Sequence, residues 1–151
     1  MSFTESSHFD AKNRAKIVMA FGTFDLFHPG HVYYLSQAEQ YAEKFIVVIA
    51  RDERVTKLKG RRPKDDEDTR QRNVSHAFKT AEVIIGDEKD IFAPLRMYAP
   101  DVLAFGYDQR VPEEEIKKLF PNIEIIRIGG YEIEKWKSSL LREQKEKEER
   151  E

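Results

Sequence analysis

The sequence contains no cysteine. This absence excludes disulfides, thiol nucleophiles and metal sites with cysteine ligands. The sequence also lacks any apolar run near the ~20 residues that cross a bilayer. Its first residues, MSFTESSHFDAKNRA, have no hydrophobic signal core. We therefore expect a cytoplasmic protein without a membrane segment.

Neither sign of charge is in excess: 36% of the residues are charged, but the formal net charge is only −2. This balance gives no indication of binding to nucleic acid or to a membrane surface. The 151 residues suit one domain with one hydrophobic core. We expect a flexible extension over residues 1–14, a domain over 15–143 and a charged helix end over 144–151.

Short apolar runs alternate along the chain with segments of helical periodicity. The predicted strands are residues 16–21, 45–50, 82–85, 102–105 and 123–128. The predicted helices are residues 30–44, a short helix followed by a loop within 51–68, and 69–79, 91–98, 113–120 and 138–151. This alternation is typical of a parallel sheet covered on both faces. We predict an α/β fold, namely a Rossmann-like doubly wound parallel sheet of about five strands.

The first predicted strand is followed by the segment GTFDLFHPGH at residues 22–31. Proline is favoured in the first turn of a helix, so Pro29 predicts a helix start between His28 and His31. Both imidazoles can then lie beside backbone N–H groups that favour anionic oxygens. Such a site suits a phosphate that gains charge during phosphoryl transfer. The alternative is a pair of ordinary surface or capping histidines.

GTFDLFHPGH resembles the signature of the cytidylyltransferase-like (HIGH-type) nucleotidyltransferase superfamily, in which H-x-G-H follows a GTFD-type turn. The resemblance covers about residues 16–142. It implies in-line transfer at the α-phosphorus without a covalent intermediate, with His28 and His31 stabilising the transition state. It also implies Mg²⁺ held mainly by phosphate oxygens and water. The residues that it assigns to the triphosphate and nucleoside are Thr23, Phe24, His28, Pro29, Gly30 and His31.

Basic residues after the second predicted strand extend the resemblance. The segment ARDERVTKLKGRRP is similar to a family segment in which a lysine contacts phosphate groups. Lys57 is the expected residue, with catalytic and substrate-phosphate roles, and Lys59 is the alternative. Arg70, in DTRQR, resembles an arginine that opens the next helix. It either reaches the substrate phosphate or forms an ion pair with Asp66 or Asp68.

The remaining predicted contacts follow the last two strands. Asp108, in GYDQR, is similar to the G-x-D segment of the family and can accept hydrogen bonds from ribose or base; a helix cap is the alternative. Ser138 and Ser139 resemble the segment that holds the β- and γ-phosphates. Tyr131 either stacks on the base or anchors its loop. The arginine-led RTEGIST-type segment of cytidylyltransferases is absent, which leaves the base open.

Taken together, HPGH, ARDERVTKLKGR, GYDQ and the Gly-Tyr pair most resemble FAD synthases of the archaeal type, which adenylylate FMN with ATP. Those proteins often carry cysteines near the carboxyl terminus, and this chain has none. One alternative is a cytidylyltransferase or adenylyltransferase, using CTP or ATP, that acts on glycerol 3-phosphate or another polyol or sugar phosphate. Another is a nucleotide-binding module without catalysis. Relatives are commonly dimers, which suggests a homodimer by analogy alone.

Overall fold

The computed structural model describes residues 14–129, and its strands form one sheet in the order β3-β2-β1-β4-β5. The strands are β1 (Ala15–Gly22), β2 (Ala42–Ile49), β3 (Glu82–Ile85), β4 (Val102–Gly106) and β5 (Glu124–Ile128). Every pairing is parallel. The chain first builds the sheet outward from β1 to β3, then returns to place β4 on the other side of β1. The predicted doubly wound sheet is confirmed, and its switch point lies between β1 and β4.

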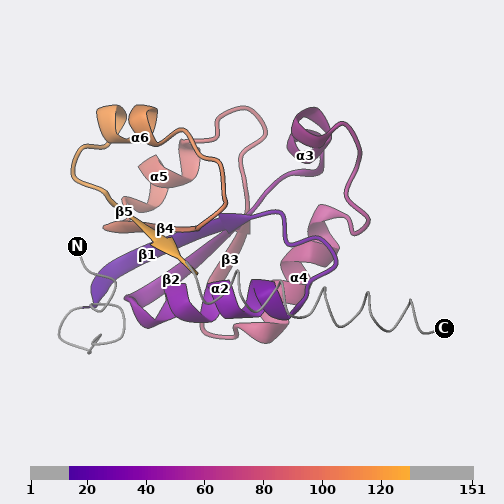
Figure 1. Ribbon diagram of the computed structural model, residues 1–151, viewed down its shortest axis with the longest axis horizontal. Helices are drawn as coiled ribbons and strands as arrows, with labels where there is room; N and C mark the ends of the chain where they lie inside the picture. Colours follow the sequence, from indigo (N-terminus) through magenta and orange to yellow (C-terminus); the bar gives the residue numbers. More distant parts are fainter. Residues whose placement is uncertain (1–13, 130–151) are drawn as a thin grey trace, which may run out of the picture.

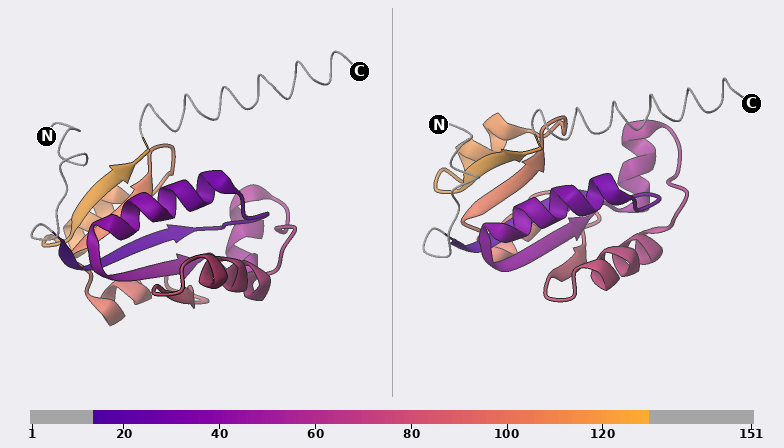
Figure 2. Two further views of the ribbon diagram at one scale, coloured as in Figure 1. Left: turned by 90° about the horizontal axis from the view of Figure 1, so that it is seen from below. Right: turned by 60° about the horizontal axis from the view of Figure 1, so that its bottom comes forward.

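Helices cover both faces of this sheet (Figure 1). On one face lie α2 (Pro29–Gln40) and α4 (Glu67–Ala77), and on the other lie α5 (Ala93–Tyr98) and α6 (Glu113–Leu119). The short helix α3 (Asp52–Lys59) follows β2 and stands beyond the carboxyl ends of the central strands (Figure 2). Within residues 14–129, no helix combines the length and apolar character needed to cross a membrane.

Each face of the sheet has its own apolar core. Because successive strand residues point to opposite faces, Val18 and Ala20 pack toward α2 and α4, whereas Met19 packs toward α5 and α6. Strand β2 divides in the same way and contributes side chains to both cores. All three of these β1 residues are fully buried. The central strand is thus fixed from both sides, and its carboxyl end provides a rigid base for the loop that follows.

The predicted helix over 30–44 was too long. Helix α2 ends at Gln40, and the N–H of its C-cap residue Tyr41 bonds to the carbonyl of Ala38. Ala42 fits the helical spacing, but it is buried at the start of β2, where it pairs with Ala15. An alanine suits either structure, so sheet pairing decided the boundary and local periodicity did not.

Candidate active site

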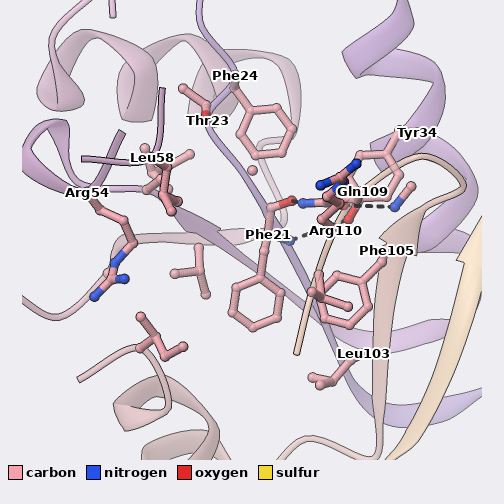
Figure 3. A pocket seen from close by; sticks show the side chains of 18 of the residues that line it. Phe21, Thr23, Phe24, Tyr34, Arg54, Leu58, Leu103, Phe105, Gln109 and Arg110 are labelled. Atoms are coloured by element: carbon pink, nitrogen blue, oxygen red, sulfur yellow. Dashed lines mark hydrogen bonds between the residues drawn. The ribbon is translucent and has the colours of Figure 1, made fainter. Parts of the chain in front are cut away.

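A cavity of ≈ 690 Å³ opens at the carboxyl ends of the strands, around the switch point (Figure 3). Its volume lies within the range of roughly 300–1,000 Å³ that is usual for ligand pockets. The predicted site residues that line it are Thr23, Phe24, His28, Gly30, His31 and Asp108. Pro29 is the first residue of α2 and is not among the lining residues. Tyr131, Ser138 and Ser139 lie outside the described residues.

Phe24 forms the floor beneath the histidines. Its backbone has a positive φ of 57°, and its side chain is buried. The ring packs edge-on against His31, with centroids 5.4 Å apart, and lies over Gly22. A Cβ at Gly22 would come within 2.7 Å of the Phe24 ring. This glycine therefore makes room for the Phe24 ring.

The two histidines cap α2 reciprocally. Nδ1 of His28 accepts a hydrogen bond from the Gly30 N–H at 3.1 Å, and Nδ1 of His31 accepts one from the His28 N–H at 3.3 Å. This arrangement satisfies helix-terminal donors in the manner of a capping box. The capping interpretation is therefore correct for both residues. It accompanies their position at the cavity and does not exclude it.

The capping bonds also determine what the imidazoles present to a ligand. Since each Nδ1 accepts a hydrogen bond, we assign the proton of each neutral ring to Nε2, which is then a donor. The rings of His28 and His31 are stacked with centroids 3.7 Å apart. His28 is exposed and His31 is half-buried. The site thus offers two parallel imidazoles at a helix N-terminus, an arrangement suited to phosphate oxygens.

Asp25, the last residue of GTFD, fixes the loop before α4. Its carboxylate accepts hydrogen bonds from the backbone N–H groups of Lys64 and Asp65, both at 2.8 Å. Desolvation alone would raise the pKa of Asp25, but these bonds and the charge of Arg70 outweigh it and lower the pKa. The carboxylate is therefore ionised at neutral pH and holds the two loops together.

Arg70 is fully buried and connects three segments. Its guanidinium donates to the Thr23 carbonyl at 2.8 Å, the Asp65 carbonyl at 3.0 Å and Oδ1 of Asp52 at 2.6 Å. The predicted ion pair with Asp66 or Asp68 is wrong, because the partner is Asp52. The predicted contact with substrate phosphate is not supported either. The guanidinium donates its hydrogen bonds to protein acceptors, and Arg70 does not line the cavity.

Helix α3 carries the basic wall of the cavity. Arg54, Leu58 and Lys59 line it, whereas Lys57 is exposed and does not. Lys59 is the last residue of α3 and borders the cavity from the carboxyl end of the helix. The structure thus favours Lys59, the alternative, over Lys57. Arg54 was missed, although its spacing of four from Leu58 places both on one face.

The amino ends of α3 and α4 cap each other. The Asp52 N–H donates to Oε1 of Glu67 at 2.8 Å, and the Glu67 N–H donates to Oδ2 of Asp52 at 3.3 Å. Each carboxylate therefore lies at the positive end of the other helix. Arg70 binds the same Asp52, so the basic wall is joined by polar contacts to the GTFD loop.

Two further residues at the switch point were missed. The amide of Gln109 donates to the Phe21 carbonyl and accepts from the Gly106 N–H, both at 2.8 Å. The Tyr34 hydroxyl donates to the Ala104 carbonyl, and burial raises its pKa. These contacts join residues far apart in the sequence, so no local signal reveals them. Asp108, the residue predicted in this loop, is exposed at the cavity.

The remaining wall of the cavity is apolar. Phe21 and Phe105 stack with ring centroids 5.6 Å apart. Figure 3 shows Phe21 and Phe105 across the cavity from Arg54 and Leu58. Leu58 is 76% exposed, and Ile91, which also lines the cavity, is 39% exposed. One cavity thus combines the histidine pair at the N-terminus of α2 with an apolar region.

Comparison with known proteins gives concordant matches. A family model described as cytidylyltransferase-like matches residues 19–144. The FAD synthase of Methanosarcina mazei is 45% identical over 101 residues, which are 67% of this chain and 66% of that protein. The FAD synthase of Ferroglobus placidus is 40% identical over 121 residues, 78% of each chain. That of Picrophilus torridus is 37% identical over 129 residues, covering 83% of this chain and 92% of its own.

A solved structure gives the same fold. The crystal structure of the lipopolysaccharide core biosynthesis protein from Thermoplasma volcanium superimposes with a TM-score of 0.70 at 31% sequence identity. The match covers 78% of this chain and 99% of the other.

Proposed function

The chain belongs to the cytidylyltransferase-like family, and from this premise we propose that it transfers AMP from ATP to FMN, giving FAD and pyrophosphate. The observation that carries the chemistry is the stacked histidine pair at the cavity end of α2, with each Nδ1 accepting a backbone N–H. The choice of ATP and FMN is supported by the FAD synthases that resemble the chain over most of its length.

The proposed reaction is a single in-line displacement. A phosphate oxygen of FMN attacks the α-phosphorus of ATP, a new P–O bond forms, and the bond to the β-phosphate oxygen breaks with release of pyrophosphate. Negative charge that builds on the transferred group is stabilised by His28, His31 and the positive end of the α2 dipole. No covalent intermediate is required.

The other predicted contacts complete this proposal. In this proposal, Lys59 and Arg54, which line the cavity from α3, meet the β- and γ-phosphates. Asp108 accepts hydrogen bonds from the ribose or the base. The roles of Tyr131, Ser138 and Ser139 stay predictions from the family resemblance, within a catalytic domain over residues 15–143.

The apolar region of the cavity suits the isoalloxazine ring of FMN. A flat heterocycle gains most from aromatic and aliphatic walls, which Phe21, Leu58 and Ile91 supply. A polyol phosphate such as glycerol 3-phosphate presents no apolar surface to these side chains. The lining therefore favours an aromatic acceptor over the polyol and sugar phosphates.

Mg²⁺ is proposed to accompany the triphosphate. Within residues 14–129, no group of three or more histidine and acidic side chains is placed to hold a metal ion. The residues present fit an ion held by phosphate oxygens and water, the usual mode for Mg²⁺. When bound, it would neutralise charge on the phosphate oxygens.

Incubation of the purified protein with Mg²⁺, ATP and FMN tests the proposal. We expect FAD and pyrophosphate in equal amounts, with FAD separated by chromatography. Riboflavin is the matched control, because it carries the same ring but no phosphate nucleophile and should give no product. Turnover of CTP with glycerol 3-phosphate, and none of ATP with FMN, would overturn the choice of substrates. Nucleotide binding without turnover of any pair would support the non-catalytic module.

A further inference from the structure

The central strands part at the switch point while their outer pairings continue. Pairing between β1 and β4 ends at Ala20 opposite Ala104. Strand β1 goes on pairing with β2 as far as Gly22, and β4 goes on pairing with β5 as far as Gly106. Both strands therefore stay in the sheet for two more residues, but only on their outer sides.

Two side chains stand in the gap: the Tyr34 hydroxyl accepts from the Phe21 N–H at 3.4 Å and donates to the Ala104 carbonyl, and Gln109 stands one rung further along. The carboxamide of Gln109 donates through Nε2 to the Phe21 carbonyl and accepts through Oε1 from the Gly106 N–H, both at 2.8 Å. Figure 3 shows Gln109 beside Phe21, with a dashed line marking a bond between them. If the register of Ala20 and Ala104 continued, the Phe21 N–H would bond to the Ala104 carbonyl in the next rung, and this carbonyl and this N–H would come together in the rung after it.

We propose that Gln109 is a wedge that holds β1 and β4 apart and so keeps the crevice open for the nucleotide. This inference rests on the proposed function only in taking the cavity as the nucleotide site. A half-buried carbonyl and N–H require partners. Without the carboxamide, each is the nearest available partner of the other, so the strands would draw together beyond Tyr34 and narrow the crevice.

The surroundings hold the wedge in place. Arg127 on β5 donates to the Gln109 carbonyl at 2.6 Å and to the Gly106 carbonyl at 2.8 Å, which anchors the loop backbone. From α2, the Tyr34 hydroxyl bonds to the Phe21 N–H and to the Ala104 carbonyl, in the first rung of the gap. The helix that carries the histidines thus braces the point at which the strands separate.

A side chain that only joins the two strands, here called a staple, and a wedge that holds them apart predict opposite effects on stability. Loss of a staple leaves its partners unpaired and destabilises the fold. Loss of the wedge lets the two backbone groups bond to each other, so stability is largely kept while the ligand site shrinks. Gln71 offers a matched control, because its Nε2 donates to the Val83 carbonyl of β3 at 2.8 Å and it does not line the cavity.

The experiment compares Gln109→Ala with Gln71→Ala. For Gln109→Ala we expect the Kd and KM for ATP to rise at least tenfold, kcat at saturating ATP to change less than threefold, and the KM for FMN to stay unchanged. Its melting temperature should be no lower than that of Gln71→Ala, which should bind ATP normally. In NMR spectra of the Ala variant, a coupling across a hydrogen bond between the Gly106 nitrogen and the Phe21 carbonyl carbon should appear, and the unmodified protein should lack it.

The results separate the wedge from the proposed function. Unchanged ATP binding by Gln109→Ala would overturn the wedge even if FAD is formed normally. So would a large fall in its melting temperature without the new coupling, because that pattern identifies a staple. Appearance of the coupling in a protein that forms no FAD would support the wedge and contradict the proposed reaction instead.

Discussion

Replacement of His28 by asparagine or alanine separates the two roles that the structure gives this residue. His28 is the N-cap of α2, and its Nδ1 accepts the Gly30 N–H. Asparagine is among the best N-cap residues because its side-chain oxygen accepts the same kind of bond. It has no donor where Nε2 lies. Alanine has neither group.

The magnitudes follow from this difference. Loss of an N-cap costs about 0.5–2 kcal/mol, so His28→Ala should lower the free energy of unfolding by that amount. His28→Asn should lower it by only a few tenths. Both variants lose the donor to the transition state, and loss of one such donor typically lowers kcat about 10²- to 10³-fold. His28→Asn should therefore be a stable protein with almost no activity.

Two assays make the comparison, namely urea denaturation for stability and initial rates of FAD formation at saturating ATP and FMN. If His28→Asn kept more than a tenth of the rate, the catalytic role of His28 would be refuted. If the asparagine variant unfolded as readily as the alanine variant, the capping geometry would be wrong. His31→Asn provides a parallel test, since Nδ1 of His31 accepts the His28 N–H.

The other predictions concern the basic wall and the buried charges. Lys59→Ala should raise the KM for ATP severalfold and Lys57→Ala should not, because only Lys59 lines the cavity; equal effects in steady-state kinetics would contradict this assignment. Arg70→Met removes the buried partner of Asp52 and leaves it only Arg62 and the Glu67 N–H, so it should cost at most about 3–5 kcal/mol in urea denaturation, and a near-neutral result would refute the network. Asp25→Asn removes a carboxylate whose pKa is lowered in the folded state, so its stabilising effect should be full above the usual pKa of 3.8 and vanish as the pH falls through the lowered value. Denaturation curves of both proteins from pH 7 to acid test this, and a gap that persists unchanged at the acid end would be contrary.

The sequence predicted the strands well because each is a short apolar run, and such runs occupy a sheet that is buried on both faces. It predicted the histidine pair because the motif is contiguous. The helix boundary near Ala42 failed since sheet pairing, which is not local, decided it.

The unpredicted parts of the site share one cause. Gln109 bonds to a carbonyl 88 positions away, and Arg70 to one 47 positions away. Their roles depend on which loops the strand order brings together, and periodicity and motif spacing carry no information about that order. Lys57 and Lys59 were indistinguishable as basic residues in one segment, and only the placement of α3 against the cavity separates them.

The mutual capping of α3 and α4 has a mechanical consequence. Only Asp52 and Val55 of α3 are buried, so charges at its amino end do most of the anchoring, and the other end stops at Gly60 with a φ of 77°. A helix attached in this way is held by charged contacts at its amino end and is less firmly fixed at its other end. Salt screens the exposed contacts of α3, such as the pair of Arg62 with Asp52, more than the buried Asp52–Arg70 pair, and it leaves the apolar cores intact. Ionic strength should therefore change how α3 presents Arg54 and Lys59 to a triphosphate well before it loosens the sheet.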